Sequence, residues 1–62
     1  MTITKETTIG EVLRDDADKA AIFLEFGMHC LGCPVSQRES IEQASQVHGV
    51  DVDLLVEKLN QA

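Results

Sequence analysis

The two cysteines of this chain, Cys30 and Cys33, are the residues whose type and spacing allow chemistry. Two thiols three positions apart can close a short disulfide or offer two thiolates to a soft metal. The segment around them also contains two glycines and a proline, at Gly27, Gly32 and Pro34. Such a segment turns easily and is hard to bury. We therefore take Cys30 and Cys33 as the candidate functional residues, and no other residue suggests a reaction.

A redox role for the pair follows from its position before a predicted helix. Pro34 suits the first turn of a helix, because its ring fixes φ and its missing N–H is not needed there. This places Cys33 at the predicted N-cap, where unpaired backbone N–H groups and the helix dipole favour the thiolate. Cys30 lies earlier, in a predicted exposed loop beside His29. Either sulfur could attack a partner disulfide.

A disulfide between the cysteines would contribute little to stability. A four-residue loop removes only about 2 kcal/mol of unfolded-state entropy in the chain-entropy model. We therefore favour a reversible disulfide over a structural one, or over two small buried side chains. Thioredoxin-like proteins cap the helix with the first cysteine, but that register would put Pro34 at the fourth helical position. We therefore do not transfer to Cys30 and Cys33 the roles that the two cysteines have in thioredoxin-like proteins.

A zinc site is an alternative use of the same sulfurs. A closed site needs four ligands, and the chain offers Cys30, Cys33, His29 and His48. His29 adjoins Cys30 and would be strained in sharing one ion with it, so a complete site would require a dimer or a partner. We favour a simpler role for His48, in the last turn of a helix, where the dipole stabilises a positive charge.

Copper is a second metal alternative. The run from Gly27 to Cys33 resembles the Gly-Met-x-Cys-x-x-Cys loop of heavy-metal-associated copper chaperone domains, and two thiolates suit Cu(I). Those domains place a strand before the loop, whereas residues 17–26 here have helical spacing. A Cu(I), Zn or sulfur carrier that uses Cys30 and Cys33 stays an alternative, as does an interaction module whose cysteines are dispensable.

Length and charge exclude several classes of function. The chain of 62 residues makes one domain, with no room for an enclosed substrate pocket. Its formal net charge of −6 repels phosphate backbones and anionic lipids, and it has no Trp or Tyr to stack on bases. We expect no nucleic-acid or membrane partner. The first residues contain no apolar run typical of a signal peptide, so we expect the cytoplasm, where thiols are kept reduced.

Capping signals predict four short helices, and the first two lie before the cysteines. Thr8 and Glu11 match a capping box at the start of the first helix, which should run to about Arg14. Asp15 or Asp16 can cap the second, which ends before Gly27. The second helix is the most apolar and should be central. Its predicted apolar face comprises Ala17, Ala20, Ala21, Ile22, Phe23, Leu24 and Phe26, with Asp18, Lys19 and Glu25 left for water.

The other two predicted helices follow the cysteines. One should begin at Pro34, or two residues later if Ser36 caps it, and continue to a stop at Gly49. Asp51 caps the last. The predicted inward residues are Ile41, Ala44, Val47 and His48 in the third helix and Val52, Leu55, Val56 and Leu59 in the fourth. No segment alternates as a strand does, so the fold class is all-α; residues 3–5 could lie extended against the bundle.

Almost the whole chain resembles a known family of small domains. The residues that carry the resemblance are Thr8 to Leu13, Phe26 to Pro34, Glu39, Ile41, Glu42, Ala44, and His48 to Val52. Together they resemble the hybrid-cluster-protein-associated redox disulfide domain, a small domain of unknown function. The resemblance implies a compact helical domain and a redox disulfide at Cys30 and Cys33, in some cases encoded near hybrid iron–sulfur cluster proteins. It implies no particular substrate.

The leading hypothesis is a thiol–disulfide redox module that uses Cys30 and Cys33 and exchanges with an unidentified partner protein. Any enzymatic activity would be limited to this exchange. We expect no cofactor and no resident metal in this role. The sequence leaves open which cysteine attacks and whether the chain acts as a monomer.

Overall fold

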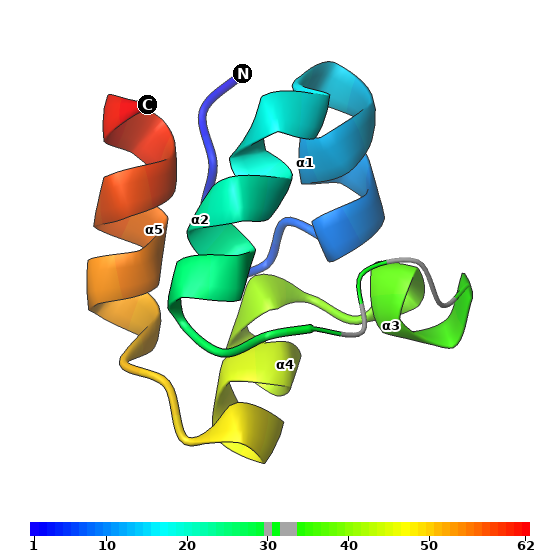
Figure 1. Ribbon diagram of the computed structural model, residues 1–62, viewed down its shortest axis with the longest axis vertical. Helices are drawn as coiled ribbons and strands as arrows, with labels where there is room; N and C mark the ends of the chain where they lie inside the picture. Colours follow the sequence, from blue (N-terminus) through cyan, green and yellow to red (C-terminus); the bar gives the residue numbers. More distant parts are fainter. Residues whose placement is uncertain (30, 32–33) are drawn as a thin grey trace.

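The structure of this chain is a computed structural model that describes residues 1–29, 31 and 34–62. Within the described residues it is all-α, as predicted, and contains no strand. Its elements are α1 (Ile9–Asp15), the 3₁₀ helix η1 (Ala17–Lys19), α2 (Ala20–Glu25), α3 (Pro34–Arg38), α4 (Ile41–His48) and α5 (Val52–Gln61). Figure 1 shows α2 in the middle, with α5 on its left and α1 on its right. In the same view α4 lies below α2, and α3 lies below and to the right of α1. No helix in the described part of the chain is long and apolar enough to cross a membrane.

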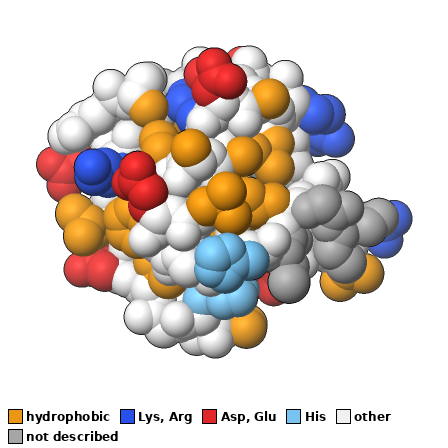
Figure 2. Space-filling view, in the orientation of Figure 1, with side chains coloured by type: hydrophobic (Ala, Val, Ile, Leu, Met, Phe, Trp, Pro, Cys, Tyr) orange, Lys and Arg blue, Asp and Glu red, His pale blue; other side chains and the backbone are white. Residues whose placement is uncertain are grey.

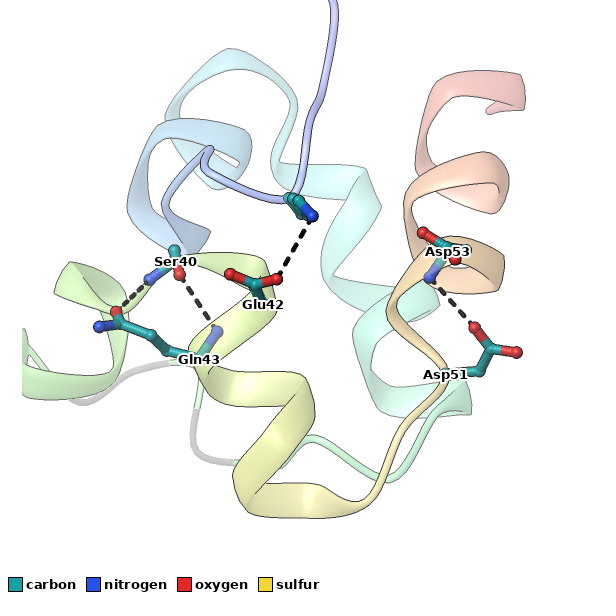
Figure 3. A network of polar contacts seen from close by, with 6 residues as sticks. Ser40, Glu42, Gln43, Asp51 and Asp53 are labelled. Atoms are coloured by element: carbon teal, nitrogen blue, oxygen red, sulfur yellow. Dashed lines mark hydrogen bonds and ion pairs between the residues drawn. The ribbon is translucent and has the colours of Figure 1, made fainter.

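Local capping signals predict most helix ends correctly. The Thr8 hydroxyl accepts the Glu11 N–H at 3.2 Å at the start of α1. At the start of α5 the Asp51 carboxylate accepts the N–H of Asp53 at 3.1 Å (Figure 3). It also accepts the N–H of Leu54 at 3.3 Å. Because each of these contacts lies within three residues of its cap, the sequence is enough to predict them.

Two glycines and one aspartate also mark the ends of helices. Gly27, after α2, and Gly49, after α4, have φ of 84° and 68°, the left-handed values expected of residues that end helices. Asp16 caps η1 by accepting the Asp18 N–H at 3.0 Å. The predicted second helix therefore begins as a 3₁₀ turn and continues as α2.

The predicted third helix is two helices in the structure. It begins at Pro34, as predicted, but α3 ends at Arg38 and α4 starts at Ile41. Ser40 caps α4 in a capping box with Gln43, with hydrogen bonds of 3.1 and 3.0 Å (Figure 3). The alternative cap at Ser36 is wrong.

The N-terminal segment explains the break between α3 and α4. The Ile9 N–H donates to the Glu39 carbonyl at 3.1 Å, and the Ile41 N–H donates to the Thr7 carbonyl at 2.9 Å. A lone antiparallel bridge pairs Thr8 with Ser40. Backbone groups that would continue one helix through residues 39–41 are therefore used by residues 7–9 instead.

The core lies between the helices and includes the N-terminal segment. Its buried apolar residues are Ile3, Ile9, Val12, Phe23, Met28, Ile41, Ala44, Leu55 and Leu59. The Asn60 side chain holds Ile3 in place: it accepts the Ile3 N–H and donates to the Ile3 carbonyl, both at 2.9 Å. The expectation that this segment lies against the bundle is confirmed at Ile3, although it forms no strand.

Some predicted inward residues of the second and third helices are exposed. In α4, Val47 is 75% exposed and His48 is exposed, whereas Ser45 is 1% exposed. Positions i+3 and i+4 share a face with the buried Ile41, so Ala44 and Ser45 lie inward, whereas Val47, at i+6, turns outward. His48 stays exposed in the last turn of the helix.

In the second helix, Phe23 is buried while Ala17, Ala21 and Leu24 are exposed, because α2 turns only one face to the core. Lys19 is buried, contrary to prediction. The 3₁₀ turn rotates the chain by about 120° per residue instead of about 100°, which presents the Lys19 stem to the protein.

Candidate functional site

The chain approaches the cysteines from a fixed point in the core. After α2 the Gly27 N–H donates to the Leu24 carbonyl and the Met28 N–H donates to the Phe23 carbonyl, each at 3.0 Å. This pair of bonds, with Gly27 left-handed, is a Schellman motif, and it satisfies the last carbonyls of the helix. Met28 is 1% exposed. The motif and the buried side chain fix where the backbone leaves the bundle, one residue before the exposed His29.

A second contact between this segment and the rest of the protein is made by Leu31, which lies between the cysteines in the sequence. Leu31 is partly buried and packs against the core. Its carbonyl accepts a hydrogen bond of 2.8 Å from the side-chain amide of Gln37, on α3. Gln37 therefore links the helix that follows the cysteine pair to Leu31, one of the two residues between the cysteines.

The position of α3 depends in turn on Gly10 in α1. A Cβ atom at Gly10 would lie 2.9 Å from the Gln37 carbonyl oxygen and 3.3 Å from the Gln37 Cβ. No side chain other than hydrogen fits this approach without a shift of the α3 backbone. The sequence prediction missed both residues of this contact. The available signal was a glycine in the first turn of α1 that ends no helix.

The predicted site residues themselves, Cys30 and Cys33, lie outside the described residues. The expectations that Cys33 is an N-cap and that a sulfur is reachable from solvent therefore also lie outside the described residues. The question of which sulfur attacks stays open for the same reason. One related prediction is confirmed in the described residues: α3 begins at Pro34, the residue that follows Cys33 in the chain.

The two histidines weighed as zinc ligands are both exposed. His48 lies in the last turn of α4, as predicted. Figure 2 shows histidine side chains on one face, beneath an apolar patch. Among the described residues, no group of three or more His, Cys, Asp or Glu could hold a metal ion. The zinc alternative requires Cys30 and Cys33, which lie outside that part of the chain.

These features define a small all-α domain in which a C-x-x-C segment follows a buried methionine and precedes a short helix held by α1. The family model described as a domain of unknown function (DUF1858) matches residues 3–56, and the chain belongs to this family. The family description assigns no activity. This match does not show a redox disulfide or an association with hybrid-cluster proteins.

A solved structure supports the same fold. The chain is similar to a protein from Clostridium thermocellum whose solution structure was determined by NMR as a Northeast Structural Genomics Consortium target, with 56% sequence identity and a TM-score of 0.83. The similarity covers 95% of this chain and 84% of that one. No curated protein matches the chain.

Proposed function

We propose that this domain is a thiol–disulfide exchange module in which Cys30 and Cys33 reduce a disulfide of a partner protein. One thiolate attacks a partner sulfur, which forms a mixed disulfide and releases the other partner sulfur as a thiolate. The second cysteine, as thiolate, then attacks the mixed disulfide and releases the first partner sulfur. The module ends as the Cys30–Cys33 disulfide. Two electrons pass to the partner, whose two thiolates take up the two protons that the module has lost.

The observation that carries the proposal is the start of α3 at Pro34, immediately after Cys33 in the chain. A thiol that precedes a helix start is favoured as thiolate by unpaired backbone N–H groups. The buried Met28 and the Gln37–Leu31 hydrogen bond support it further, because they fix the chain near both cysteines. Exchange requires two sulfurs presented in a reproducible arrangement.

The resemblance to the hybrid-cluster-protein-associated redox disulfide domain supports the same role. We place the partner in oxidative or nitrosative metabolism on that basis. A cytoplasmic location belongs to the proposal, because a reducing compartment would regenerate the dithiol.

Trapping of mixed disulfides tests the proposal. Cys30→Ser and Cys33→Ser variants are expressed separately in the native host, and adducts are identified by mass spectrometry after alkylation. We expect one variant to accumulate a discrete partner adduct that thiol reductant releases, and that variant retains the attacking sulfur. The double variant is the matched control. Equal adduct levels in all three proteins would contradict the proposal.

A soft-metal or sulfur carrier on the same two sulfurs is the second candidate. Two thiols three positions apart favour it, because a pair of thiolates suits a soft ion such as Cu(I). Native mass spectrometry of protein purified without chelator separates the two functions. A stoichiometric bound ion that is lost in the double serine variant would favour the carrier, whereas metal-free protein that forms a disulfide would favour exchange.

A further inference from the structure

Residues of α1 and α3 line a surface groove. Figure 1 shows these two helices on the side of the molecule opposite α5. Its volume is about 360 Å³, and its lining residues are Thr8, Gly10, Arg14, Gln37 and Arg38. The groove lies where Gly10 meets the carbonyl of Gln37. A size near 300 Å³ is at the lower end of the range for ligand sites.

The groove gathers positive charge in an acidic protein. Arg14 and Arg38 are the only arginines of the chain, 24 positions apart in sequence, and the packing of α1 on α3 brings both to this groove. Both are exposed, and in the described part of the chain neither forms an ion pair, whereas Lys5 pairs with Glu42 at 3.6 Å. The net charge of the whole chain is −6.

The carboxylates next to Arg14 in sequence have other partners. Asp15 pairs with the N-terminal ammonium at 3.8 Å, and the Asp16 carboxylate accepts the Asp18 N–H at 3.0 Å. Because neither arginine forms an ion pair in the described part of the chain and both are exposed, both guanidiniums are available to an anionic ligand. The planar guanidinium presents two N–H groups that match a carboxylate, which makes arginine the preferred side chain for this recognition.

We propose that this groove binds an acidic segment of a partner protein, with one carboxylate on Arg14 and another on Arg38. Two guanidiniums from two helices suit a ligand that carries carboxylates along a chain. An open groove suits an extended peptide better than an enclosed small molecule. The five residues of α3 rise by about 6 Å from Pro34 to Arg38, so such a segment would lie within a few residues of the C-x-x-C pair. The binding itself stands on the groove alone and is independent of thiol exchange.

NMR titration of the full chain in thiol reductant tests this inference. The probe is a capped peptide of four glutamates around one glycine, and its glutamine counterpart is the control. We expect saturable shifts of amides in α1 and α3 with the glutamate peptide, weakened by added salt because exposed charges are screened. No shift with the glutamate peptide, or equal affinity for the glutamine peptide, would overturn the proposal. Equal shifts from inorganic phosphate at the same concentration would also overturn it, because the groove would then be a general anion site.

Charge-matched variants locate the site. We expect Arg14→Gln and Arg38→Gln each to weaken binding roughly twofold to fivefold, the effect of one exposed charged contact. Lys58→Gln on α5 removes the same charge far from the groove and should change affinity less than twofold. Arg14→Lys keeps the charge without the planar fork and should fall between wild type and Arg14→Gln. Equal losses in the Lys58 and arginine variants would overturn the proposal.

Discussion

The contact between α1 and α3 makes a quantitative prediction for Gly10→Ala. The new Cβ would lie 2.9 Å from a backbone carbonyl oxygen, which cannot rotate away as a side chain could. Overpacking of this kind costs about 1–3 kcal/mol. Alanine in place of glycine in a helix returns up to about 1 kcal/mol. We expect a net loss of about 1 kcal/mol, which corresponds to a decrease in Tm of about 4–8 °C for a domain of this size.

Thermal unfolding followed by circular dichroism measures this change, and two controls isolate the contact. Gln37→Ala retains the opposing carbonyl and Cβ, so Gly10→Ala should remain destabilising in that background. Gln46→Gly and Gln46→Ala, compared at an exposed position of α4, give the propensity difference without a contact. A Gly10→Ala protein as stable as wild type, or more stable, would refute the close approach of α1 and α3.

Three further predictions concern stability and are measured by the same unfolding assay. Ser40→Ala removes the N-cap of α4 and should lower the free energy of unfolding by about 1 kcal/mol. Ser45→Ala removes a buried hydroxyl that has no partner in the described residues, so it should be neutral or stabilising. Equal losses of stability in the two variants would contradict this prediction. Asn60→Ala breaks both hydrogen bonds to Ile3 and should lower the free energy of unfolding by about 1–3 kcal/mol. An unchanged stability would show that the N-terminal segment is not held against the helices in this way. Gly49→Ala forces a side chain into a left-handed conformation and should cost about 1–2 kcal/mol, although nothing lies within 4 Å of its Cβ; an unchanged Tm would exclude that conformation.

The sequence predicts those parts of the fold that depend on near neighbours. Thr8, Gly27, Gly49 and Asp51 act through bonds to residues a few positions away, and each lies where its type predicts. The break at Glu39 was not predicted, because it depends on hydrogen bonds with residues 7–9, some thirty positions earlier in the chain. The prediction for Val47 failed for another reason: the buried face of α4 runs through Ile41, Ala44 and Ser45, which leaves Val47 outside.

The candidate site divides in the same way. The spacing of Cys30 and Cys33 and the helix start at Pro34 can be read from the sequence. The support for that segment is tertiary: Gln37 bonds to Leu31, and Gly10 permits the approach of α3. The groove with Arg14 and Arg38 also arises only when α1 and α3 pack, so no local pattern marks it.

The redox equilibrium of the purified chain with glutathione buffers tests the central claim most directly. The Cys30–Cys33 disulfide is quantified by mass spectrometry after acid quenching and alkylation, over a series of ratios of reduced to oxidised glutathione. We predict a single reversible transition to the intramolecular disulfide, with a potential in the range of cellular thiol oxidoreductases, roughly −270 to −120 mV. Protein that stays reduced at every ratio, or that forms only glutathione adducts, would contradict a dithiol–disulfide module.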